Sequence, residues 1–589
     1  ERRWTARPKI ARVNEYIRYE PDDRCPPHLS IGVAFQGVLL ALANTVLFVT
    51  VMVRAGGQGD DYLSWAVFSA LAIGGIITAL QAGRAGRLGA GHVLMTGAGP
   101  HFIGVSVLAL TAGGLSMLAS LIIVSSLVQF ALARWLPLLR RVITPVVSGI
   151  ALMLIAVTVM LIAVGRLSEV PEGAPAVAGP TVAVATLAVA TMLAMRASGI
   201  WRLWAPLIGI ASGCGVAALF GLYDPQPVVE ARWFYTPDVA AWPGLDLSPG
   251  AEFWTLLPVF LIVSFVVAIK MSSDGVVIQR VSRKRPQATD FRLVQAAVNT
   301  NGLGTLLSGI AGTLPPIVYT PSMVTLINLT GVAARSVGYA IGAILLVLAF
   351  LPKAAAVLLT IPSPVMGAFL LMIMGLLFVE GMRMVVQDGL DHRKALVVGV
   401  SLSIGVGLQS QNVLADLLGQ TWGASLGNGL TVGVLAAILM TLFIELTSPR
   451  HTRLETTLEM SALPKIDAFL RQLASRIGWN DASTERLRAA GEETLSSLLQ
   501  SGNDQGADGV PRLIINARPG EAVELEFLAV FDEGNLEDRL AHLNEQAEVP
   551  EEHEISFWLL RHYASSVRHR KYHGIDIVTV HVEGSRSPD

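Results

Sequence analysis

Two long apolar stretches between Leu256 and Thr330 are interrupted by residues that membrane-spanning helices rarely carry. The first, LLPVFLIVSFVVAIKMSSDGVVIQ, contains Lys270 and Asp274, and the second, NGLGTLLSGIAGTLPPIVYTPSMVTLINLTG, is broken by Gly and Pro. Ionisable residues at bilayer depth are costly and mark functional sites by default. Apolar segments broken by Gly and Pro leave free backbone groups that bind ligands in transporters. This region therefore predicts a polar site inside a membrane.

Composition supports a polytopic membrane protein. The 589 residues are 52% hydrophobic and only 15% charged, whereas soluble domains carry about 25% charged residues. The net charge of -2 gives no reason to expect a nucleic-acid partner. Cys25 and Cys214 are too few and too poorly placed for a disulfide framework or a metal site, so neither a metal nor a cofactor is expected.

The hydrophobic pattern divides the chain into three parts. Residues 1–28 form a charged, Pro-containing tail, residues 29–449 hold about fourteen apolar runs of spanning length, and residues 450–589 are polar. The predicted spans are 29–53, 62–82, 91–112, 115–137, 143–165, 180–196, 203–222, 252–272, 293–312, 317–333, 335–351, 362–382, 394–411 and 427–447.

Basic residues alternate between the predicted loops. The loops on the side of the N-terminus are rich in Arg and Lys, as in RVSRKRP after the eighth span, whereas the other side holds only a few. The positive-inside rule therefore predicts that both termini are cytoplasmic. The expected location is a bacterial-type inner (plasma) membrane. The basic residues on the outer side are Arg54, Arg166, Arg232 and Lys353.

Two predicted spans carry Gly and Pro where a span is normally most regular. Residues 91–112 begin GHVLMTGAGPHFIGV, and residues 309–330 read GIAGTLPPIVYTPSMVTLINLT. They are the third spans of the first and second sets of seven. Matched broken segments in two halves of opposite topology indicate an inverted repeat with a site at the bilayer midplane.

Several motifs resemble one transporter family. CPPHLSIGVAFQG, GAGPHFIGV, AIKMSSDG and the run from Asn301 to Gly367 resemble the nucleobase/ascorbate transporters, also called uracil/xanthine permeases, and the similarity covers residues 24–447. The resemblance implies a 7+7 transmembrane inverted repeat with core and gate domains, a homodimer, and nucleobase symport with protons or sodium. It also implies that short strands in the third and tenth spans meet at the membrane centre.

Several positions that the family uses for substrate differ here. Gln36 is followed by Gly where the family has a Gln-His pair, and Lys270 stands where the family usually has a Glu. In the signature of the tenth span, the matching positions are Pro316, Thr320 and Pro321. The resemblance therefore predicts the transporter class more firmly than the substrate.

Lys270 and Asp274 are four residues apart, so on a helix they share a face and can pair. One interpretation is an inert internal ion pair; the other is that Lys270 binds an acceptor-rich or anionic ligand while Asp274 anchors it or carries the coupling proton. Glu380 and Asp388 are expected at an inner end, where solvation is cheap. The candidate substrate-binding residues are Lys270, Asp274, Tyr319, Thr320, Ser322, His101, Phe102 and Gln36.

The pattern of helical and strand-like segments in residues 450–589 predicts an α+β domain. Helical periodicity is clear in IDAFLRQLASRIG and ERLRAAGEETLSSLLQSG. Strands are expected in RLIINAR, AVELEFLAVF and IDIVTVHV, with a late helix in EISFWLLRHYASSV.

The order of these elements resembles the histidine-kinase-like ATPase fold of anti-sigma-factor kinases. The resemblance implies nucleotide-binding roles for Glu493, Asp532 and Gly534, but Ser497 replaces an Asn, Leu536 replaces a second Gly, and no glycine-rich lid precedes Ser556. Without free backbone amides near a polyphosphate, we expect an inactive domain that regulates or dimerises; retained nucleotide binding is the alternative.

The leading hypothesis is a secondary active transporter of nucleobases or related small polar solutes that works by alternating access. One alternative is an anion transporter or exchanger of the same fold that uses Lys270. Another is a transporter-derived sensor that signals through residues 450–589. The expected partners are a small-molecule substrate, the lipid membrane, a second copy of the chain and a possible cytoplasmic regulator.

Overall fold

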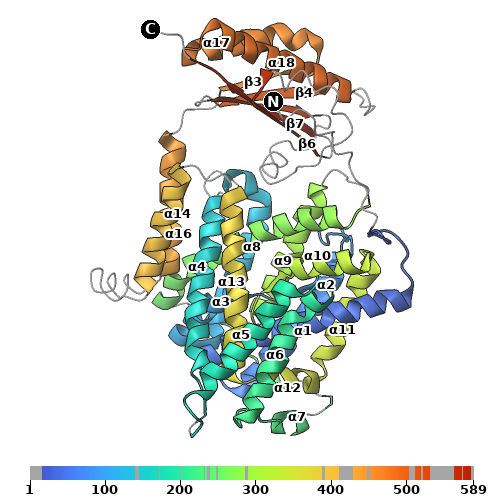
Figure 1. The fold of residues 1–589 in the computed structure, drawn as a ribbon, viewed down its shortest axis with the longest axis vertical. Helices are drawn as coiled ribbons and strands as arrows, with labels where there is room; N and C mark the ends of the chain where they lie inside the picture. The colour runs from blue at the N-terminus through green and yellow to red at the C-terminus, as the bar shows by residue number, and fades with distance from the viewer. Residues whose placement is uncertain are drawn as a thin grey trace. The chain divides into compact units, whose positions relative to one another are not determined.

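The computed structural model divides into two compact units (Figure 1). The helical unit comprises Glu15–Arg283 and Arg292–Ile444, and the second unit contains Glu445–Asp589. The structure describes all residues except 1–15, 140–144, 172, 199, 231–232, 235–238, 247–249, 285–289, 388–391, 410–428, 448–451, 503–510, 519–521, 531–562, 573–574 and 586–589.

Twelve of the fourteen predicted spanning runs fall mainly on helices of the helical unit, and the other two, 91–112 and 317–333, fall partly on short strands. Among the described helices, seven are long enough and apolar enough to cross a membrane. Helix α3 changes direction at Gly114, whose φ of 79° lies in the left-handed region, and so supplies two consecutive runs. The helices are α1 (Pro27–Ala55), α2 (Asp60–Ala82), α3 (Ile103–Leu139), α4 (Pro145–Leu167), α5 (Ala178–Arg196), α6 (Ile200–Leu219), α7 (Gln226–Glu230), α8 (Ala251–Val281), α9 (Phe291–Ala311), α10 (Thr320–Thr330), α11 (Arg335–Ala349), α12 (Pro352–Leu359), α13 (Ser363–Gln387), α14 (His392–Gln409) and α16 (Gly429–Thr447), with short 3-10 turns η1 (Pro100–Phe102) and η2 (Val239–Ala241).

The two broken segments meet as predicted. Strand β1 (Thr96–Ala98) pairs antiparallel with β2 (Pro316–Val318), and all six residues are buried. Each strand leads into a helix, β1 through η1 into α3 and β2 into α10. The structure thus confirms a discontinuous helix in each half of the helical unit.

The helices form two bundles. In the core bundle α2 packs along α11 and α3 along α8, while in the gate bundle α4 packs along α13 and α5 along α6. Helices α4 and α13 are the fifth runs of the two sets of seven. A Cβ on Gly381 would lie 2.6 Å from the carbonyl oxygen of Gly149, and a Cβ on Gly149 would lie 2.5 Å from that of Gly381. The α4 and α13 backbones therefore touch where both helices carry glycine.

A leader strap, residues 16–25, runs beside the core bundle. The Arg18 amide donates to the carbonyl of Gly331 over 2.7 Å, and the Arg335 amide donates to that of Pro21 over 3.1 Å. These backbone bonds fix the strap where α10 ends and α11 begins.

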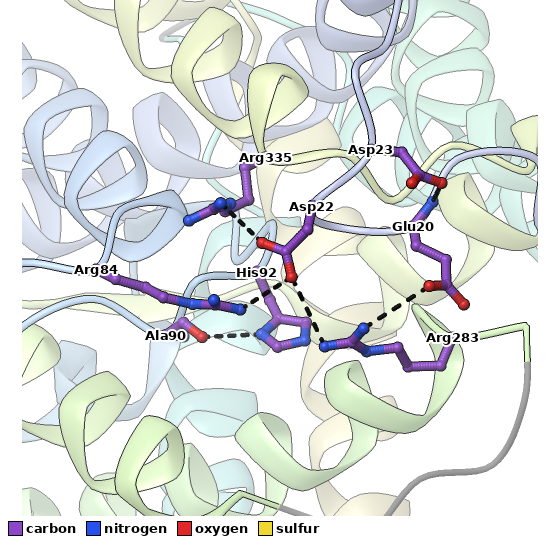
Figure 2. A network of polar contacts seen from close by, with 8 residues as sticks. All are labelled: Glu20, Asp22, Asp23, Arg84, Ala90, His92, Arg283 and Arg335. Atoms are coloured by element: carbon purple, nitrogen blue, oxygen red, sulfur yellow. Dashed lines mark hydrogen bonds and ion pairs between the residues drawn. The ribbon is translucent and has the colours of Figure 1, made fainter.

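Charged side chains add to this attachment (Figure 2). The Asp22 carboxylate lies 2.7 Å from Arg335, 3.4 Å from Arg84 and 3.9 Å from Arg283, and Glu20 lies 3.7 Å from Arg283. The three arginines stand just after α2, just after α8 and at the start of α11. Asp22 therefore ties three core helices together at one end.

The second unit is a five-stranded antiparallel sheet, in the order β3-β4-β5-β7-β6, packed against two helices. Ile466, Leu470 and Leu495 from the helices form its core with Ile515 and Phe527 from the sheet. The elements are β3 (Thr452–Thr457), η3 (Met460–Ala462), α17 (Leu463–Ile477), α18 (Asp481–Gly502), β4 (Arg512–Arg518), β5 (Ala522–Val530), β6 (Ser566–Tyr572) and β7 (Ile575–Glu583).

The sequence predicts the two helices and the three central strands of this unit, but not the two edge strands of its sheet. The two amphipathic helices and strands β4, β5 and β7 lie where the sequence placed them. Strands β3 and β6 were missed, because edge strands such as TRLETT and SVRHRKY carry charges in place of an apolar pattern. Ser566 and Val567, predicted to end a late helix, belong to β6; residues 554–562 of that helix lie outside the described residues.

We expect Gly381→Ala to destabilise the helical unit by about 1–3 kcal/mol, because the added methyl would meet the α4 backbone. Gly375→Ala, in the same helix with nothing within 4 Å of its Cβ position, is the matched control and should leave stability unchanged or slightly raised. Thermal unfolding of the purified protein in detergent measures both. Equal melting temperatures for the two variants would contradict the close packing.

We expect Asp22→Asn to lower stability by about 1 kcal/mol, because three guanidinium groups lose their shared carboxylate. Asp23→Asn is the control, since Asp23 accepts only the Glu20 amide in this network and an amide oxygen can replace it. Because these side chains are partly exposed, the difference should shrink in high salt. An Asp22→Asn protein as stable as the control would show that the ion pairs are unimportant.

Candidate functional site

The candidate site lies where the strand pair, α8 and α10 meet. Helix α8 contacts β2, η1 and the adjoining helix α10. Thr320 is the first residue of α10, so the positive end of that short helix points toward the strands. The broken segments thus bring polar backbone and side chains to one buried place.

Lys270 and Asp274 form an ion pair of 2.8 Å on α8, and their exposed fractions are 8% and 5%. The predicted pairing along one helix face is therefore present in the structure. Thr320, 5% exposed, lies beside the Asp274 carboxylate, but its Oγ1 makes no hydrogen bond of normal geometry in the described structure. The three side chains form a compact polar group.

Tyr319 has a structural connection within the same region. Its hydroxyl donates to the Ala98 carbonyl over 2.6 Å and lies 3.3 Å from Thr45 Oγ1, while its amide donates to the Met95 carbonyl. Tyr319 therefore links β2 to β1 and to α1. Its hydroxyl is already engaged by the protein.

His101 and Phe102 in η1 face different surroundings. His101 is 1% exposed, neither ring nitrogen has a hydrogen-bond partner in the described structure, and Lys270 lies within electrostatic range. Phe102 is fully buried and packs on Phe260 of α8 with ring centroids 6.3 Å apart, which is core packing. His101 lines a small cavity with Gly104, Val105, Leu108, Ile155, Thr158 and Leu430.

Gln36 and Ser322 are less closely connected to the pair. Both are half-buried, Gln36 on α1 and Ser322 on α10. Within the described residues, no hydrogen bond or ion pair joins either of them to Lys270 or Asp274. The structure thus groups Lys270, Asp274 and Thr320, with His101 nearby.

Glu380 was misjudged from the sequence. It is half-buried on α13 and interacts electrostatically with both Lys270 and Asp274, so the gate bundle also contributes a charge to this region. Counting along the helices would have placed Glu380 at the depth of the pair: it stands 17 residues into α13, and Lys270 stands 19 into α8. Asp388 lies outside the described residues.

The nucleotide residues suggested for the second unit are only partly described. Glu493 lies on α18, where partial burial and then the neighbouring Glu492 raise its pKa above the ordinary value. Asp532 and Gly534 lie outside the described residues. Nucleotide binding stays a prediction.

Comparison with known proteins concerns mainly the helical unit. The model of the Permease family (Xan_ur_permease) matches residues 29–414. Xanthine permease XanP of Escherichia coli (strain K12) is 25% identical over 457 residues, covering 74% of this chain and 96% of XanP. Uric acid permease PucK of Bacillus subtilis (strain 168) is 23% identical over 424 residues, with 72% and 96% covered. Among solved structures, the transmembrane domain of a cyanobacterium bicarbonate transporter, BicA, aligns at a TM-score of 0.47 and 16% identity, covering 72% of this chain and all of that chain.

We expect Lys270→Met to cost about 3–5 kcal/mol of stability, because it leaves the Asp274 carboxylate buried without its partner. The double variant Lys270→Met/Asp274→Asn should recover most of this loss, since neither charge remains. A thermal double-mutant cycle measures the coupling. Simple addition of the two single effects would show that the pair is not coupled.

Proposed function

Since the chain belongs to the permease family, a family of transporters rather than enzymes, we propose that it is a secondary active transporter of nucleobases of the xanthine, urate or uracil class. The observation that carries the proposal is the buried group Lys270, Asp274 and Thr320 beside a crossed strand pair. The permeases XanP and PucK, similar over most of their length, support the substrate class.

The chemistry of the site suits an uncharged ring rich in carbonyl oxygens. The Lys270 ammonium would donate to such oxygens, and the Thr320 hydroxyl and the free amides at the start of α10 would add further donors. Asp274 would accept a ring N–H or carry the coupling proton. Gln36, Ser322 and His101 would complete the contacts.

Alternating access would move the core bundle against the gate bundle. The strand pair, Lys270 and Asp274 belong to the core, whereas Glu380 belongs to the gate. A substrate held beside α8 would then travel with the core. Coupling to protons or sodium, a homodimer, an inner-membrane location and cytoplasmic termini complete the proposal.

The second unit would act as a cytoplasmic regulatory or dimerisation domain without ATPase activity. In this proposal residues 29–449 carry transport and residues 450–589 respond to or control it. The alternative of a ligand sensor uses the same two parts without flux.

An anion carrier is the second candidate because Lys270 is a buried cation. The neighbouring charges oppose it. Asp274 neutralises Lys270 at 2.8 Å, and Glu380 adds a second carboxylate within electrostatic range. A site with one amine and two carboxylates favours a neutral or cationic species over an anion. By the same argument xanthine and uracil, which are mainly neutral at pH 7, suit the site better than urate, which is a monoanion.

Uptake of labelled xanthine, urate and uracil into proteoliposomes containing the full chain tests the proposal. We expect uptake of at least one of them, and Lys270→Ala should abolish binding because it removes the buried donor. Thr255→Ala, at the exposed start of α8, is the control and should transport normally.

The Lys270→Met/Asp274→Asn variant separates loss of a ligand contact from misfolding, since it has no buried unpaired charge. Bicarbonate or chloride flux without nucleobase flux would overturn the proposal in favour of the anion carrier. Nucleobase binding without any flux would favour the sensor.

A further inference from the structure

Helices α8 and α10 both run from the polar group of Lys270, Asp274 and Thr320 to the leader strap. Asp274 lies nine residues before Arg283, which follows the end of α8. Thr320 lies 11 residues before Gly331, which ends α10. At 1.5 Å per residue, these paths are about 13 and 16 Å long. The strap therefore contacts both helices at nearly the same distance from the polar group.

The strap is bonded to the end of α10 through its backbone. The Arg18 and Tyr19 amides both donate to the Gly331 carbonyl, over 2.7 and 3.1 Å. The Ala333 amide donates to the Tyr19 carbonyl over 2.9 Å. Gly331 has a φ of 69°, in the left-handed region, and a Cβ there would lie 2.3 Å from the Tyr16 carbonyl oxygen. Glycine at this position thus lets the strap lie against the turn that ends α10.

The strap is bonded to α8 through charge. Glu20 and Asp22 lie 3.7 and 3.9 Å from the Arg283 guanidinium (Figure 2). Asp22 also lies 2.7 Å from Arg335, the first residue of α11, and only the four residues 331–334 separate α11 from α10. Asp22 therefore connects the end of α8 to the end of α10 by way of the start of α11.

We propose that Asp22 is a positioning residue for substrate binding, acting through Arg283 and Arg335. The strap closes a frame whose long sides are α8 and α10 and whose opposite side is the contact of Asp274 with Thr320. When the strap is released, α8 and α10 can shift against one another, and fewer molecules hold the polar group in its binding arrangement. The apparent affinity falls in proportion to that fraction. The inference rests on the proposed function and deepens it.

Arg84 distinguishes positioning from general stabilisation. Its guanidinium lies 3.4 Å from the same Asp22 carboxylate, but it follows α2, which carries no member of the polar group. Loss of the Arg84 ion pair should lower stability without loosening α8 against α10. Loss of the Arg283 or Arg335 ion pair should do both.

Uptake of labelled xanthine and of labelled uracil by the full chain in proteoliposomes, over a range of concentrations, tests the proposal. We expect Asp22→Asn to raise KM about threefold to tenfold with a nearly unchanged maximal rate, because saturating substrate restores the binding arrangement. Arg283→Gln should act in the same way. Arg84→Gln and Asp23→Asn should keep the KM of the parent chain. An unchanged KM in Asp22→Asn, or an equal rise in Arg84→Gln, would overturn the proposal.

Hydrogen–deuterium exchange of the purified full chain without any nucleobase gives a test that does not depend on the substrate. We expect faster exchange of the α10 amides in Asp22→Asn and Arg283→Gln than in Arg84→Gln, because the end of α10 loses its connection to α8. Choline chloride should speed this exchange in the parent chain and have less effect in Asp22→Asn, since salt screens the ion pairs that the variant lacks.

The two measurements separate failure of this proposal from failure of the proposed function. Normal exchange of α10 in Asp22→Asn would overturn the positioning role, whatever the chain transports. Faster exchange in that variant, with no uptake of either base by the parent chain, would support the connection through the strap and count against the nucleobase assignment.

Discussion

The need to satisfy backbone hydrogen bonds inside a membrane determines the centre of this protein. A chain interrupted by Gly and Pro at mid-span leaves amides and carbonyls that neither lipid nor its own helix can pair. Here the two broken segments pair with each other, in the register Thr96 with Val318 and Ala98 with Pro316. That pairing fixes where α3 and α10 begin, and so where their free ends meet α8.

The same constraint requires glycine where the segments cross α1. A Cβ on Gly97 would lie 2.4 Å from Thr45 Oγ1 and 2.8 Å from the Tyr319 hydroxyl. The Tyr319 hydroxyl bonds the Ala98 carbonyl in that space. Fold and site are therefore coupled: a larger residue at Gly97 would displace the strand that holds α10 against Lys270 and Asp274.

Local spacing made part of this predictable from the sequence. The Gly and Pro residues predicted the broken segments, and the four-residue spacing predicted the ion pair between Lys270 and Asp274. Long-range packing did not show in the sequence. Nothing in GAGPHFIGV reveals that Phe102 packs in the core against Phe260. Counting along the helices gives the depth of Glu380, but not that α13 packs where it brings this carboxylate within range of the pair. The edge strands β3 and β6 of the second unit were not predicted for a related reason. Their sequences are charged, and it is pairing with the neighbouring strands that makes them extended.

The arrangement of charges has a consequence for movement. Lys270 and Asp274 lie on one helix, so a rigid displacement of the core bundle leaves their 2.8 Å contact intact. Glu380 belongs to the gate bundle, so the same displacement changes its distance to both. The attraction between Lys270 and Asp274 is therefore the same in the inward-facing and outward-facing states, while their interaction with Glu380 differs. Only an interaction that differs between two states can shift the equilibrium between them. In the proposed mechanism, the position of Glu380 would thus make the electrostatic energy of the Lys270–Asp274 pair depend on which way the transporter faces.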